Sequence, residues 1–76
     1  MEYEILKQAI SRVLQVYEKE ITPDATFSGD LGADSIDMLQ IMQYVEQTMN
    51  KKFRSIDPEK IITVADGVRA MQNEME

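Results

Sequence analysis

The chain has 76 residues with 14 acidic and 8 basic side chains, a formal net charge of −6, and neither cysteine nor histidine. A chain of this length forms one small core, and its negative charge disfavours nucleic acid and anionic membranes while favouring basic partners. The lack of cysteine excludes disulfides and agrees with a reducing compartment, and no run approaches the ~20 apolar residues that span a bilayer. Since the charged N-terminus does not resemble a signal peptide, we expect a cytoplasmic monomer with a single domain over residues 1–76.

Residues 2–17 carry apolar side chains at three- and four-residue steps, which predicts an amphipathic first helix. Residues 18–34 contain one proline and two glycines and keep no period, so they predict a long loop. A loop of this length in so small a domain is often functional. Three spaced apolar residues are expected to attach it to the core: Ile21, Phe27 and Leu31.

A second helix is predicted to start at Ser35, because Asp34 suits an N-cap and Asp37 lies three residues further on, in the first turn. Its end is marked by Asn50, followed by two lysines that complement the negative end of the helix dipole. The buried stripe is predicted from apolar residues at helical spacing. These are Ile36, Leu39, Met42, Val45 and Met49, with Ile41 beside them.

Residues 53–63 are interrupted by Pro58 and predict a single turn or a short helix. Thr63 and Asp66 then resemble a capping box, with aspartate in place of the usual glutamate or glutamine, and a last helix follows. No strand pattern and no internal repeat is visible in the sequence. The predicted fold class is therefore all-α, a small four-helix bundle of three principal helices and one short helix.

The residue types do not provide a self-contained catalytic or metal site. Ser35 would need an activating base to act as a nucleophile, and histidine, the usual base, is absent. Zinc sites normally use cysteine or histidine, and Asp30, Asp34 and Asp37 do not have the spacing of a calcium loop. The glycines match no phosphate-binding or dinucleotide motif. We therefore expect no catalytic residue and no metal ligand, and an interaction or carrier role.

The segment Asp30-Leu31-Gly32-Ala33-Asp34-Ser35-Ile36-Asp37 resembles the attachment motif of acyl carrier proteins, D-L-G-x-D-S-L-D, with isoleucine for the usual leucine. Residues 25–27, Ala-Thr-Phe, match the aromatic anchor ahead of that motif. Residues 60–64, Lys-Ile-Ile-Thr-Val, match the family's K-I-T-T-V at the start of the last helix. The resemblance to the phosphopantetheine-binding acyl carriers thus covers almost the whole chain.

This resemblance implies that a phosphopantetheinyl transferase moves 4′-phosphopantetheine from coenzyme A onto the Ser35 hydroxyl, with Gly32, Asp34 and Ile36 flanking the site. The arm ends in a thiol that holds acyl groups as thioesters, so a carrier needs no cysteine of its own. Ser35 is then an acceptor, and the transferase supplies the base and any metal. Gly32 would let the loop approach closely with no side chain in the way.

The resemblance also implies surfaces for partners and for cargo on the second and third helices. Acyl-transferring or acyl-activating enzymes would dock on the second helix. The docking residues implied are Asp34, Asp37, Met38, Gln40, Ile41 and Glu46. The acyl chain would lie against or between the helices, in a pocket lined by Leu39, Met42, Val45, Phe53, Ile61 and Ala65.

The second helix departs from the strongly acidic helix with which fatty-acid carriers dock on basic patches of their enzymes. Gln40 and Gln47 stand where acids are common, and Lys51, Lys52 and Arg54 reverse the charge beyond the helix end. These basic residues either complement the helix dipole or form a contact patch. The departures favour a specialised lipid or polyketide-type pathway over primary fatty-acid synthesis. An aminoacyl or peptidyl carrier and an unmodified helical adaptor are the alternatives.

Overall fold

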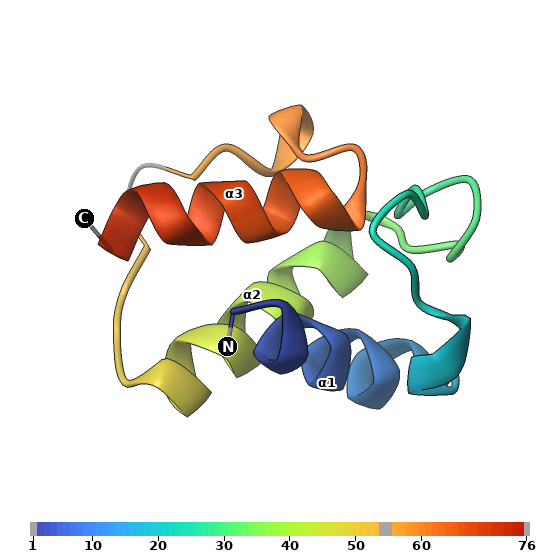
Figure 1. Cartoon of the computed structure of the whole chain (residues 1–76), viewed down its shortest axis with the longest axis horizontal. Coiled ribbons are helices and arrows are strands. Elements are labelled where there is room, and N and C mark those ends of the chain that lie inside the picture. Colours follow the sequence, from blue (N-terminus) through green and yellow to red (C-terminus); the bar gives the residue numbers. More distant parts are fainter. Residues whose placement is uncertain (1, 54–55, 76) are drawn as a thin grey trace.

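The computed structural model describes residues 2–53 and 56–75, and this part of the chain holds three α-helices: Glu2–Leu14 (α1), Ser35–Met49 (α2) and Val64–Met75 (α3). α1 packs against both other helices. In Figure 1, α1 and α3 run roughly side by side, α2 crosses behind them, and the long loop lies at the end where α2 and α3 begin. The described residues contain no strand, so the predicted all-α class is confirmed. None of these helices is long and apolar enough to cross a membrane.

The predicted fourth helix is not found in the described residues. In the described residues between α2 and α3, the helical backbone is limited to a 3-10 turn, Pro58–Lys60. The amide of Lys60 donates to the Asp57 carbonyl at 3.0 Å, and the amide of Glu59 donates to the Asp57 carboxylate at 3.0 Å. The turn does not continue, because two isoleucines and a threonine follow, and β-branched residues favour extended backbone. In residues 2–53 and 56–75, the bundle therefore has three α-helices.

The first helix is shorter than the predicted span of residues 2–17. α1 ends at Leu14, and Gln15 adopts a left-handed conformation with φ 57°. The amide of Gln15 donates to the Ser11 carbonyl at 2.9 Å, and the Ser11 hydroxyl donates to the Val16 carbonyl at 2.7 Å. The following loop is also more ordered than predicted, since it contains a 3-10 turn, Glu18–Glu20.

One core joins the three helices and the loops between them. Ile21 and Phe27 are both 3% exposed, and Leu31 is half-buried against the same core, which confirms that these residues attach the long loop. The other buried members are Leu6, Ala9, Ile10, Ala25, Ala33, Ile41, Val45, Phe53, Ile61, Val64 and Met71.

The predicted buried stripe of α2 is wrong at its beginning. Ile36 and Leu39 are 64% and 57% exposed, whereas Ile41 and Val45 are 2% and 1% exposed. The half-buried apolar residues of α2 beside them are Met38, Met42, Tyr44 and Met49. Apolar residues occupy most of the circumference of α2, so periodicity allowed more than one stripe, and packing against α1 decides between them.

The long loop is joined to the start of α3 by a short extended pairing that includes an isolated antiparallel bridge between Thr26 and Thr63. We call the two paired segments, residues 23–27 and 62–65, the clasp. Three backbone hydrogen bonds of 3.0 Å join them: Phe27 N to Ile62 O, Val64 N to Ala25 O, and Ala65 N to Pro23 O. The clasp thereby fixes the loop that leads into α2.

Candidate functional site

The start of α2 is closed by two aspartates that cap each other's backbone. The Asp34 carboxylate accepts a hydrogen bond from the Asp37 amide at 2.8 Å, and the Asp37 carboxylate accepts one from the Asp34 amide at 3.2 Å. The predicted cap at Asp34 is confirmed, and Asp37 completes a capping box. Both carboxylates therefore have a structural role at the helix start.

Ser35 is the first residue of α2, and its side chain is exposed. In the described part of the chain, no acceptor is bonded to the amides of Ser35 and Ile36. Such unpaired amides at a helix start, together with the positive end of the helix dipole, favour a negatively charged group. The serine hydroxyl thus lies in the open beside two unpaired donors.

The loop before Ser35 is held by a second reciprocal pair. The Asp30 carboxylate accepts from the Thr26 amide at 2.9 Å, and the Thr26 hydroxyl oxygen accepts from the Asp30 amide at 2.9 Å. A Cβ on Gly29 would lie 2.8 Å from that hydroxyl oxygen, so a side chain at position 29 would displace it. The first acid of the attachment motif therefore shapes the loop.

Gly32 turns the chain for a reason different from the one predicted. Apart from its two chain neighbours, no described residue has an atom within 4 Å of where a Cβ on Gly32 would be. Its φ is instead 68°, in the left-handed region that glycine adopts easily. After this turn, the Ala33 amide donates to the Phe27 carbonyl at 2.7 Å, and Ala33 is 7% exposed. Burial of Ala33 fixes the position of the two residues that follow it.

The three aspartates of the motif do not form a metal site in the structure. Each carboxylate of Asp30, Asp34 and Asp37 accepts a backbone hydrogen bond instead. Within residues 2–53 and 56–75, no group of three or more histidine, cysteine or acidic side chains is arranged to hold a metal ion.

A groove of about 460 Å³ opens directly beside Ser35. It runs between α2 and the segment before α3, and it includes the exposed Leu39 and Ile62. Its lining residues are Phe27, Ser28, Ala33, Asp34, Ser35, Met38, Leu39, Glu59, Ile61 and Ile62. An apolar hollow next to a reachable hydroxyl is suited to hold an apolar group attached there.

The residues predicted to line an acyl pocket are divided among different places. Leu39 and Ile61 line the groove, while Met42 and Val45 line a separate inner cavity of only about 20 Å³, to which Ile61 also contributes. Phe53 is buried and lines neither hollow. Ala65 lies on the opposite side of α3, in a shallow groove with Tyr3, Pro23, Val68 and Arg69.

The residues predicted to dock partners are likewise not all on the surface. Asp34 and Gln40 are exposed and Asp37 is half-buried, but Ile41 is 2% exposed, because it packs in the core. Met38 is half-buried and faces the groove. Ile41 therefore does not contact a partner in this conformation.

Glu46 holds the chain after α2 instead of standing free. Its carboxylate accepts from the Phe53 amide at 2.9 Å and lies 3.9 Å from the Lys52 ammonium. Lys51 and Lys52 are exposed at this end of α2, and Arg54 lies outside the described residues. The helix thus has acidic groups beside Ser35 and two lysines at its other end.

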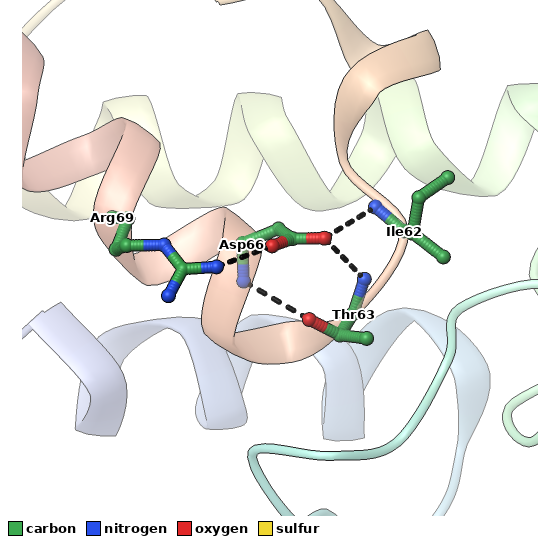
Figure 2. Close-up of polar contacts among 4 residues, drawn as sticks. All are labelled: Ile62, Thr63, Asp66 and Arg69. Carbon is green, nitrogen blue, oxygen red and sulfur yellow. Dashed lines mark hydrogen bonds and ion pairs between the residues drawn. The ribbon is translucent and has the colours of Figure 1, made fainter.

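The far wall of the groove is held by a carboxylate at the start of α3. Figure 2 shows Asp66 accepting hydrogen bonds from the amides of Thr63 and Ile62, each at 3.1 Å, and pairing with Arg69 at 2.6 Å. The Asp66 amide donates to the Thr63 hydroxyl oxygen at 3.2 Å, which confirms the predicted capping box. The backbone donors of Thr63 and Ile62, followed by Arg69, lower the pKa of Asp66 below its ordinary value.

Several lining residues were missed by reasoning from the sequence, among them Ser28, Glu59 and Ile62. For Ile62, the sequence did contain a usable pattern, namely two successive isoleucines before the last helix. In extended backbone, successive side chains point to opposite sides, so one isoleucine is buried at 9% exposure and the other lies on the surface at 57%. No local pattern marks Ser28 or Glu59.

The family of the chain follows from comparison with known sequences. The family described as the phosphopantetheine attachment site matches residues 4–70. The chain belongs to this family, in agreement with its resemblance to the acyl carriers. Domains of this family are non-catalytic carriers to which 4′-phosphopantetheine is covalently attached, and they interact with a phosphopantetheinyl transferase and with biosynthetic enzymes.

Proposed function

We propose that the Ser35 hydroxyl is the attachment point for 4′-phosphopantetheine and that the chain, as a single monomeric domain, carries acyl groups between biosynthetic enzymes. The observation that carries this proposal is the position of Ser35: exposed, first in α2, and on the rim of an apolar groove. When bound, the group supplies a flexible arm with a terminal thiol, on which acyl groups are held as thioesters.

The surroundings of Ser35 fit such a group. The unpaired amides of Ser35 and Ile36 favour a phosphate, and the groove offers apolar walls to whatever the arm carries. Asp34 and Asp37 oppose the phosphate by charge, but their carboxylates are engaged by backbone amides. This chain has no histidine to serve as the base, so the transferase must remove the serine proton.

The test is modification of the unmodified protein by a promiscuous phosphopantetheinyl transferase with coenzyme A and Mg²⁺, followed by intact-mass measurement. We expect one phosphopantetheine on the wild type and none on Ser35→Ala. Ser28→Ala is the matched control, because Ser28 is also exposed and lines the same groove. An unmodified wild type, or equal mass gains in wild type and Ser35→Ala, would refute the proposal and favour a helical adaptor.

We further propose that the carrier serves a specialised lipid or polyketide-type pathway. The exposed face of α2 supports this, because Gln40, Gln43 and Gln47 are exposed and uncharged. Enzymes of fatty-acid synthesis dock through basic patches, and charge steers such encounters. The neutral face would therefore be recognised poorly by those enzymes.

This proposal is tested by malonyl transfer from a fatty-acid synthase malonyltransferase to the phosphopantetheinylated protein. We expect slow transfer to the wild type and faster transfer to the triple variant Gln40→Glu, Gln43→Glu, Gln47→Glu, with the gain lost at high salt. Gln8→Glu with Gln72→Glu is the control, since both glutamines are exposed on other helices. Efficient malonyl transfer to the wild type would count against a specialised carrier.

A further inference from the structure

The groove beside Ser35 and the inner cavity are separated by a wall of three side chains. The residues that line both hollows are Phe27, Met38 and Ile61, so the groove lies on one side of them and the inner cavity on the other. We call these three residues the partition. Whatever is attached to Ser35 must pass the partition to move from the surface into the core.

The inner cavity is too small for a chain of carbon atoms as the structure stands. Its volume of about 20 Å³ has room for roughly one water-sized group. Its walls, however, include three methionines, Met38, Met42 and Met71. Methionine is unbranched and adapts its shape more easily than other apolar residues, so the cavity has room to grow if these side chains repack.

The members of the partition differ in how easily they move. Phe27 is 3% exposed, and its backbone is held on both sides, by bonds to Ile62 and Ala33. Ile61 is β-branched, and the amide of the next residue is bonded to the Asp66 carboxylate. Met38 is half-buried, has three rotatable side-chain bonds, and lies one helical turn after Ser35. Met38 is therefore the member of the partition whose side chain can be shortened with the least disturbance of the backbone.

We propose, on the basis of the proposed attachment at Ser35, that Met38 determines where the cargo lies. With Met38 as it is here, an acyl chain rests in the surface groove against Leu39 and Ile62. In the wild type, a straight chain of eight carbons stays in the groove because Met38 closes the way to the inner cavity, and it enters the core only when the side chain at position 38 is shortened. The side chain at position 38 thus decides whether the cargo lies in the groove or in the core.

The first test uses the unmodified protein and benzene as a small apolar probe. Methyl NMR signals of Val45 and Met71, which line the inner cavity, should stay unchanged in the wild type and shift saturably in Met38→Ala. Met49→Ala is the matched control, because Met49 is a half-buried methionine of α2 that lines neither hollow. If Met38→Ala fails to fold, Met38→Val should show the same shift at smaller amplitude.

The second test uses protein loaded from octanoyl coenzyme A by a promiscuous transferase. In the wild type the octanoyl chain should shift the methyl signals of Leu39 and Ile62 and leave those of Val45 and Met71 unchanged. In Met38→Ala the octanoyl chain should shift the methyl signals of Val45 and Met71. Hydroxylamine should also cleave the thioester several-fold more slowly, because a chain that enters the core draws the thioester toward it.

The outcomes separate this inference from the proposed function. Equal shifts of Val45 and Met71 in wild type and Met38→Ala, with either probe, would overturn the role of Met38, as would equal responses of Met38→Ala and Met49→Ala. If no octanoyl group is transferred to Ser35, the proposed function fails, while the benzene experiment still decides whether Met38 closes the cavity.

Discussion

The starts of α2 and α3 are built from the same local device and differ in what surrounds them. Each begins with a reciprocally bonded pair three residues apart, Asp34 with Asp37 and Thr63 with Asp66. At α3, the first two helical amides donate across the clasp to the long loop. At α2, within the described residues, the corresponding amides have no protein acceptor.

This difference shows that a capping box by itself does not make a site. Each capping box provides an acceptor for some of the amides at its helix start. At α3, the other amides donate to the long loop and so join two parts of the fold. At α2 they are left open beside an exposed hydroxyl and an apolar groove. The start of α3 holds the structure together, and the start of α2 is available to another molecule.

The largest effect is expected from removing the carboxylate at the anchored start. Asp66→Ala loses the acceptor for Ile62, Thr63 and Arg69 at once, so its urea midpoint at neutral pH should fall clearly below that of the wild type. Asp34→Ala, at the open start, should cost about 1 kcal/mol, as is usual for an N-cap. Circular dichroism during urea unfolding measures both. Equal losses of stability in the two variants would mean that holding the clasp residues Ile62 and Thr63 gives Asp66 no more stabilising effect than an ordinary N-cap.

A smaller effect is expected from acid, through the same group. The pKa of Asp66 is lowered in the folded chain, so its contribution to stability is present above the unfolded value of 3.8 and is lost as pH falls through the lower folded value. Asp66→Asn should therefore be less stable than wild type near neutral pH, and the difference should shrink below about pH 4. Urea midpoints across this range test the prediction, and a constant difference would contradict it.

The smallest effect is expected from Arg69→Ala. Arg69 pairs with Asp66 at 2.6 Å, but its side chain is 69% exposed, and exposed ion pairs contribute little to stability. The urea midpoint should hardly change. A loss of stability as large as that of Asp66→Ala would instead mean that Asp66 stabilises the fold mainly through its ion pair with Arg69, and that its bonds to backbone amides contribute less.

Both helix starts could be predicted from the sequence, because a capping box is a local pattern. Asp34 before Ser35, and Thr63 three residues before Asp66, are recognisable within a single turn. The attachment motif around Ser35 was visible for the same reason, since its residues are contiguous.

The parts that could not be predicted depend on contacts between distant segments. Exposure of Ile36 and burial of Ile41 are decided by how α2 packs on α1, because apolar residues surround most of that helix. Glu46 resembled a free docking charge, but its carboxylate is bonded to the Phe53 amide seven residues later. The end of α1 at Leu14 lacks the glycine that usually marks such a turn.

The clasp has a consequence for when the site comes into being during synthesis. It pairs the loop ahead of Ser35 with residues 62–65, which leave the ribosome well after α2 has been made. Such distant pairings form late, because closing a long stretch of chain is entropically unfavourable. A nascent chain that ends before Ala65 therefore offers the serine without its fixed loop or its groove. The start of α2 thus acquires its complete surroundings only after the first residues of α3 have been made.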